Sequence, residues 1–293
     1  MLKISVIEAP SILGLKPTGV QYLPDSLKSA NLVGQLRAEY VGRIEAPPYD
    51  PKLDNATYLL NPQGIHDYSL RLAEAVTSVL EENKFPLVLG GDCSILIGNL
   101  LALRRIGNYG LFFIDGHADF YQPEASPTGE VADMDLAIVS GRGPDILTNI
   151  DGLKPLVQDN NIVLFGHRDA EEAKAYGSQN VRESDISVLD LEEVRKFGIE
   201  RAASKALDKL LNENLKGFWI HFDVDVLDDE VMPAVDYRMK GGMNFTEISK
   251  LLKIILKSGR AVGMDITIFN PTLDKGGGIS RKLVSSVVEG FSN

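Results

Sequence analysis

Short β-type apolar runs alternate with amphipathic stretches along almost the whole chain, and this alternation restricts the fold more than any other feature. The apolar runs are expected to be strands at residues 3–8, 86–89, 110–114, 161–165, 217–222 and 260–264. The amphipathic stretches are expected to be helices at residues 68–83, 95–105, 202–214, 246–257 and 280–289. Such alternation predicts a three-layer α/β/α fold with a mostly parallel central sheet covered by helices on both faces.

Composition places the chain among ordinary globular proteins. Of 293 residues, 44% are hydrophobic and 24% charged, and no repeat or linker divides them, so residues 1–293 are expected to form a single domain. The longest apolar runs are far shorter than the roughly 20 residues that span a bilayer. The N-terminus resembles a strand more than a signal peptide, and a single cysteine suits a reducing compartment, which together predict a cytoplasmic location.

The net charge of −11 bears on the partners of the chain. No basic cluster larger than the pair at residues 104–105 stands out. Nucleic acids and anionic membranes both require a basic surface, so neither is expected as a partner. A small-molecule substrate is expected instead.

Four of the apolar runs end in an aspartate: Asp92, Asp115, Asp223 and Asp265. The carboxyl ends of parallel strands meet at one edge of the sheet, where α/β proteins bind their ligands. One aspartate at such a place usually caps a helix or forms a turn. Four are hard to explain by capping, so this edge is predicted to be a cation site.

Ligand-type side chains also recur at alternate positions after two of these runs. Asp115, His117 and Asp119 form one such series, and Asp223 and Asp225 form another. Alternate residues of an extended segment point to the same side, so each series can converge on a cation. Carboxylates with an imidazole suit Mn²⁺, Zn²⁺, Fe²⁺ or Ni²⁺. Carboxylates can also bridge two ions about 3.5–4 Å apart, which then activate a shared hydroxide.

The motifs GGDCS at 90–94, DGHAD at 115–119, DVDVLDD at 223–229 and GMDITIFNPTLD at 263–274 resemble those of the ureohydrolases. This family includes arginases, agmatinases, guanidinobutyrases and formiminoglutamases, and its metal motifs have the forms GGDHS, DAHxD and DxDxxDP. The resemblance implies an arginase-like fold and hydrolysis of linear C–N bonds in amidine, guanidino or formimino compounds. It also implies one or two divalent ions, with Mn²⁺ the first choice, and a homotrimer or hexamer.

The resemblance further assigns residues to two metal positions. One would use Cys93, Asp115, Asp119 and Asp223, and the other Asp115, His117, Asp223 and Asp225. Asp115 and Asp223 would bridge the ions, a metal-bound hydroxide would attack the planar carbon, and Asp265 would orient neighbouring side chains.

Cys93 stands where the family has a metal-binding histidine. It would be a thiolate ligand that favours Zn²⁺ or Fe²⁺, an inert part of the lining, or the mark of a lost metal. In the last case Asp115, His117 and Asp223 would form the site of a mononuclear amide hydrolase or deacylase. A non-catalytic metal-binding or regulatory homologue is the third alternative.

Ile268 stands where arginase-like members have a glutamate that holds the guanidinium. A cation desolvated against isoleucine would be unpaired, so a less charged substrate, or a cation paired with another acid, is expected. Asn270, Arg168 and Asp169 are the other predicted substrate-binding residues, and Arg168 and Asp169 are expected to pair with each other.

The irregular segment 121–144 lacks the loop histidine of family arginases. Glu130, Asp133 or Asp135 would supply a carboxylate for proton transfer instead. His221, two residues before Asp223, would either face the metal side or be a buried core histidine. Three residues are the predicted catalytic groups: Asp119, Asp133 and His221.

Overall fold

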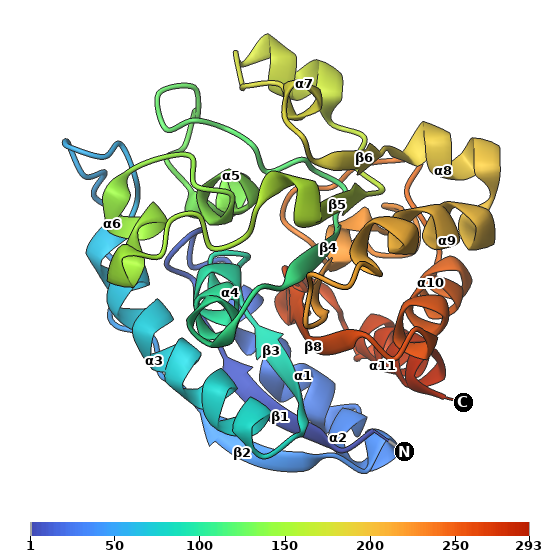
Figure 1. Ribbon diagram of the computed structural model, residues 1–293. Helices are drawn as coiled ribbons and strands as arrows, with labels where there is room; N and C mark the ends of the chain where they lie inside the picture. Colours follow the sequence, from blue (N-terminus) through green and yellow to red (C-terminus); the bar gives the residue numbers. More distant parts are fainter. Residues whose placement is uncertain (1, 293) are drawn as a thin grey trace.

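A computed structural model describes residues 2–292 and contains one eight-stranded sheet in the order β2-β1-β3-β8-β7-β4-β5-β6 (Figure 1). Every strand pair is parallel, which confirms the predicted sheet. The strands are β1 (Ile4–Ala9), β2 (Glu39–Arg43), β3 (Phe85–Gly90), β4 (Gly110–Ile114), β5 (Ile162–Phe165), β6 (Ser187–Leu189), β7 (Phe218–Asp223) and β8 (Ala261–Thr267).

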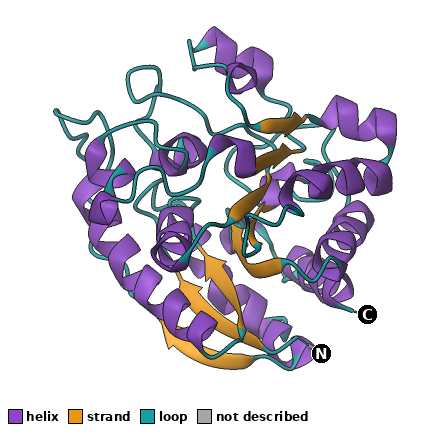
Figure 2. Cartoon of the chain, viewed as in Figure 1, coloured by secondary structure: helices purple, strands orange, loops and turns teal. Residues whose placement is uncertain are grey.

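Helices cover both faces of this sheet, which gives the expected three layers (Figure 2). The helices are α1 (Leu23–Ser29), α2 (Leu32–Leu36), α3 (Pro62–Glu81), α4 (Ile95–Ile106), α5 (Asp135–Val139), α6 (Asp145–Thr148), α7 (Ala170–Ala175), α8 (Leu191–Phe197), α9 (Ile199–Leu210), α10 (Phe245–Lys257) and α11 (Gly278–Phe291). Helices α3 and α4 pack over one face, and α9, α10 and α11 pack over the other (Figure 1). Within residues 2–292, no helix combines the length and apolarity required to cross a membrane.

Strand β7 shows how the sheet sorts its side chains between the two layers. Ile220 and Phe222 belong to the core under α9–α11, whereas Trp219 belongs to the core under α3 and α4. Because successive strand residues point to opposite faces, His221 and Asp223 lie on the Trp219 side. This alternation delivers both polar side chains to one face, at the carboxyl end of the strand.

The sequence interpretation missed two edge strands and short helices such as α1 and α8. It also misplaced the bounds of α3 and of α9, which spans Ile199–Leu210 rather than 202–214. Strand β2 is largely exposed and β6 has three residues, so neither shows a long apolar run. Helix α3 begins at Pro62 rather than at residue 68. The segment 121–144, predicted to be irregular, contains a 3₁₀ turn at Val131–Asp133 and helix α5.

Candidate metal centre and its pocket

Strands β4 and β7 bring the two central aspartates together. They pair in register from Gly110 opposite Phe218 to Ile114 opposite Phe222, so Asp115 and Asp223 leave the sheet as neighbours. Both side chains are buried. The Asp223 carboxylate accepts a hydrogen bond of 2.7 Å from the Asp225 N–H, and this bond folds the chain into a 3₁₀ turn directly after the strand.

Four buried side chains form what we call the inner group: Cys93, Asp115, His221 and Asp223. One potential ligand atom from each lies within 4.8 Å of all the others. The Cys93 Sγ donates to Asp223 Oδ2 at 2.8 Å. Burial, reinforced by the Asp223 charge, raises the pKa of the Cys93 thiol, which is consistent with a protonated sulfur in the absence of a cation.

Three side chains form the outer group: Asp115, His117 and Asp225. Their ligand atoms also lie within 4.8 Å of one another. His117 Nδ1 is 2.9 Å from Asp225 Oδ2 and 3.7 Å from Asp115 Oδ1, and the His117 side chain is 22% exposed. The two groups therefore share Asp115, and only the outer one has a partly exposed member.

The electrostatics of these carboxylates suit a bound cation. Burial, followed by the charges of Asp225 and Asp115, raises the pKa of Asp223 well above its usual range. Burial alone would raise the pKa of Asp225 too, but His117 holds it below the ordinary value. Among residues 2–292, neither Asp115 Oδ2 nor His221 Nε2 has a hydrogen-bond partner. Buried acids that repel one another beside unpartnered ligand atoms fit a divalent metal.

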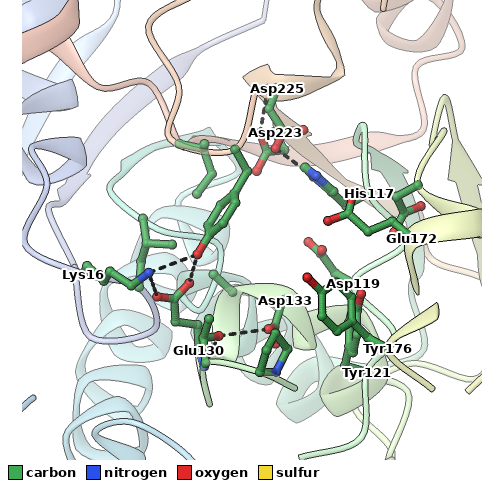
Figure 3. A pocket seen from close by; sticks show the side chains of 17 residues that line it. Lys16, His117, Asp119, Tyr121, Glu130, Asp133, Glu172, Tyr176, Asp223 and Asp225 are labelled. Atoms are coloured by element: carbon green, nitrogen blue, oxygen red, sulfur yellow. Dashed lines mark hydrogen bonds and ion pairs between the residues drawn. The ribbon is translucent and has the colours of Figure 1, made fainter. Parts of the chain in front are cut away.

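A pocket of about 410 Å³ opens against the outer group. Figure 3 shows His117, Asp223 and Asp225 on one side of this pocket and Asp119 on the facing side. Asp119 has a positive φ of 44°, and burial, followed by the charges of Asp115 and Asp135, raises its pKa well above the usual range. Its ligand atoms belong to neither the inner nor the outer group, although the sequence assigns it to a metal position.

Three acids of the segment 121–144 differ in their contacts and in whether they line this pocket. Asp133 is partly buried in the lining, accepts a hydrogen bond of 2.8 Å from Ser126 Oγ, and has a pKa raised by desolvation to about 7. Glu130 forms an ion pair with Lys16 and accepts a hydrogen bond from Tyr237 Oη (Figure 3). Asp135 lies outside the lining, and burial raises its pKa well above the usual range.

Only some of the predicted substrate-binding residues line the pocket. Ile268 and Asp169 line the pocket, whereas Arg168 and Asn270 do not. Ile268 adopts a φ of 70°, a left-handed conformation that is unfavourable for a β-branched residue. Asn270 uses its side chain locally, donating to Asp236 Oδ1 at 2.9 Å and accepting from Thr272.

The expected pairing of Arg168 with Asp169 is wrong. Arg168 donates to the backbone carbonyls of Asp225, Val226 and Leu227, and thereby holds the turn that carries the outer group. Asp169 instead contacts His167, whose Nδ1 is 3.0 Å away. The two side chains thus point to different partners after the turn at Gly166, where φ is 101°.

Two of the four aspartates predicted to line the sheet edge have other positions. Asp92 accepts from the Ser94 N–H at 2.9 Å, at the start of α4, and belongs to neither group of ligand atoms. This is the local turn contact that a lone aspartate often makes. Asp265 lies inside β8 rather than at its end, and contacts His221 instead of the pocket.

Several pocket residues had no signal that sequence interpretation used. Lys16, Tyr121, Tyr176 and Tyr237 all line the pocket (Figure 3). Lys16 could have been predicted to lie near the site, because it lies in the segment after β1, on the carboxyl edge of the sheet. The tyrosines lie in loops and in the turn after α7, and no motif marks them.

Comparison with known proteins agrees with this geometry. The Arginase family model matches residues 3–291. An arginase of Bacillus subtilis (strain 168) is 31% identical over 294 residues, covering 97% of each chain. An arginase of Staphylococcus aureus (strain COL) is 30% identical over 292 residues, covering 97% of this chain and 95% of the other. The crystal structure of Bacillus caldovelox arginase superposes with a TM-score of 0.91 at 28% identity, covering 100% and 99% of the two chains. The chain belongs to the arginase family.

Proposed function

We propose that this protein is a metal-dependent hydrolase of linear C–N bonds in small amidine-like molecules. The observation that carries the proposal is the shared Asp115, which joins two groups of ligand atoms at the wall of one pocket. Curated relatives named arginase, at about 30% identity over nearly the whole chain, support the same reaction class. Divalent cations held there would lower the pKa of water and so supply a nucleophile at neutral pH.

The residues of the chain would hold these cations in an unsymmetrical way. Cys93, Asp115 and Asp223 would bind one cation, with Asp119 on the facing side of the pocket, and Asp115, His117 and Asp225 would bind the other. Arg168 holds the turn between Asp225 and Leu227, so the outer ligands keep their orientation. The inner position favours Zn²⁺ or Fe²⁺ because it includes sulfur, whereas the outer one suits Mn²⁺ as well.

Asp133 would deliver the proton to the leaving amine. Asp133 lines the pocket, its Oδ1 is unpartnered among residues 2–292, and a pKa of about 7 keeps it partly protonated at neutral pH. A group with a pKa near the operating pH is the most effective general acid. Glu130 serves this purpose less well, since Lys16 and Tyr237 already occupy its carboxylate.

The substrate would carry less positive charge on its reacting carbon than arginine does. Ile268 occupies the position of the family glutamate, is 4% exposed, and offers a guanidinium no carboxylate. Desolvating an unpaired cation costs several kcal/mol, on the order of a thousandfold or more in affinity. A substrate that is uncharged at its reacting group, or a cation paired with another acid of the lining such as Glu172, therefore fits the pocket better than a guanidinium held at Ile268.

The proposal is tested by removing metals with a chelator, adding back Mn²⁺, Zn²⁺, Fe²⁺, Co²⁺ or Ni²⁺ singly, and screening guanidino, amidino and formimino compounds. Release of urea, ammonia or formamide is the measured outcome. Activity should appear with at least one ion, disappear in Asp225→Asn, and persist in Asp145→Asn, whose side chain lies on the surface beside Lys154. A protein that hydrolyses none of these compounds with any ion would contradict the proposal, and turnover of simple amides alone would favour a deacylase.

A further inference from the structure

Three side chains lie side by side across the centre of the sheet: Phe113 on β4, His221 on β7 and Asp265 on β8. The register places Phe113 opposite His221 and His221 opposite Asp265. The rings of Phe113 and His221 stack with centroids 4.5 Å apart and planes 23° apart. His221 is thus confined on both sides by neighbouring strands, and its ring has one fixed orientation.

Asp265 determines which ring nitrogen of His221 is available. Its Oδ1 is 2.6 Å from His221 Nδ1, and its Oδ2 accepts hydrogen bonds from Asn99 and Trp219. In this arrangement the Asp265 carboxyl group accepts from Asn99 and Trp219 through one oxygen and holds His221 Nδ1 with the other. Nε2 is then the ring nitrogen left for a cation, as in the carboxylate–histidine–metal arrangement of many metalloproteins.

The Nε2 atom points at the inner group. It lies 4.0 Å from Asp115 Oδ2 and within 4.8 Å of ligand atoms of Cys93 and Asp223. His221 is 0% exposed, and neither Nε2 nor Asp115 Oδ2 has a hydrogen-bond partner in the described chain. A buried polar atom without a partner costs free energy, so its retention next to three ligand-type side chains indicates a ligand.

The position of His221 also bears on residue 93, where this chain has a cysteine instead of the family's metal-binding histidine. In the family motif the imidazole comes from the loop after β3, where this chain has Cys93. Here an imidazole comes from β7 instead, and Cys93 supplies sulfur from the original side. The inner position thus has sulfur, imidazole and two carboxylates, a complete four-ligand set for Zn²⁺, Fe²⁺ or Co²⁺.

We infer that His221 is a metal ligand of the inner position, bound through Nε2, and that Asp265 is the positioning residue that orients it. The inference rests on the proposed metal-dependent function and deepens it. The histidine of the inner position would thus come from β7 rather than from the loop after β3. The two metal positions would differ chemically, because only the inner one includes sulfur.

The first test measures Co²⁺ binding to metal-free protein, by competition with a chelator and by the thiolate-to-cobalt absorption that reports a Cys93 contact. His221→Asn keeps a side-chain N–H for Asp265 but removes Nε2. We expect the Cys93-linked affinity to fall by more than about a hundredfold, the upper range for residues that only orient ligands. The Asp115–His117–Asp225 position should keep its Co²⁺.

His167→Asn is the matched control. His167 is also buried, also places Nδ1 against an aspartate, and also has an unpartnered Nε2 among residues 2–292, but it belongs to neither ligand group. Its substitution should leave Co²⁺ binding unchanged. Equal binding in His221→Asn and His167→Asn would overturn the inference and leave the proposed function standing, whereas wild-type protein that binds no metal would overturn both.

A second measurement requires no folded His221 variant. The chain has four histidines, so the ¹⁵N spectrum of the imidazoles is simple, and spectra of His66→Asn, His117→Asn and His167→Asn assign His221 by elimination. Titration of wild-type protein with Zn²⁺ should shift His221 Nε2 to the metal-bound range while Nδ1 stays protonated. An Nε2 signal that stays in place at saturation would overturn the inference.

Discussion

The inner and outer groups share Asp115 but differ in their access to the pocket. All four inner side chains are buried, and His221 is enclosed between β4 and β8. In the outer group His117 is 22% exposed and faces the pocket with Asp225. A ligand from the solution therefore meets His117, Asp225 and Asp223, whereas Cys93, Asp115 and His221 do not line the pocket.

The two groups also differ in how their histidines are held. His221 is fixed by Asp265 from a neighbouring strand, behind the group, so that its free nitrogen faces the other ligand atoms. His117 instead contacts a member of its own group, Asp225, at 2.9 Å. The histidine of the inner position is therefore preorganised, whereas His117 must exchange its contact with Asp225 for a cation, as Cys93 must exchange its hydrogen bond to Asp223.

Asp115→Asn should have the largest effect, because it alters both groups at once. Asn can still accept from the His117 N–H, which Asp115 Oδ1 does at 2.6 Å, so the local turn should survive. We expect metal content to fall at both positions and any metal-dependent turnover to fall by more than about a hundredfold. Elemental analysis and activity measure this, with the surface variant Asp145→Asn alongside. Loss of one metal equivalent only would show that the groups do not share this carboxylate.

Asp133→Asn should separate pocket chemistry from metal binding. Asp133 has a pKa of about 7, raised by burial, so it is protonated below that pH and able to donate. As pH rises through about 7 the wild-type kcat should fall, and in the variant this fall should disappear while kcat drops about a hundredfold. Metal content at both groups should stay the same. A descending limb near pH 7 that persists in Asp133→Asn would assign the acid to another residue.

The sequence was sufficient for the buried strands of the sheet, though not for the edge strands β2 and β6, and for the residues around Asp115 and Asp223. Long buried strands show as apolar runs, and an aspartate that ends a strand of a parallel sheet lies at the carboxyl edge of that sheet. The motif spacing likewise indicates that His117 and Asp225 accompany them. These features are local in the chain, which is why periodicity and spacing predict them.

Side-chain contacts between neighbouring strands could not be predicted from periodicity and spacing. Asp265 resembles the other strand-end aspartates in sequence, yet β8 continues to Thr267 and places it opposite His221, 44 residues away in the chain. Arg168 and Asp169 are adjacent in sequence but diverge at a turn. Register and turn geometry set these contacts, and neither can be read from one sequence.

Asp265→Asn should weaken the inner position and leave the outer one unchanged. The Asn amide would face His221 Nδ1 with an N–H, which favours the tautomer whose proton is on Nε2, and that tautomer has no lone pair for a metal. We expect the inner affinity for Co²⁺ to fall by tens-fold, within the range for partners that orient ligands. Chelator competition measures it, and Asp169→Asn, at the partner of His167, is the matched control. Equal losses at both positions would show that Asp265 acts through the fold as a whole.

Cys93→Ser should have the smallest effect and should change selectivity rather than occupancy. The sulfur of Cys93 lies 2.8 Å from Asp223 and 3.2 Å from Thr267, and a serine hydroxyl can make the same two hydrogen bonds. Since thiolate favours Zn²⁺ over Mn²⁺ more than oxygen ligands do, we expect the Zn²⁺ to Mn²⁺ affinity ratio of the inner position to fall about tenfold. Competition between the two ions for metal-free protein measures this ratio, and the outer position is the internal reference because it contains no sulfur. An unchanged ratio would mean that Cys93 lines the site without binding the metal. The inner ligands would then be Asp115, His221 and Asp223, and the two positions would no longer differ by a sulfur ligand.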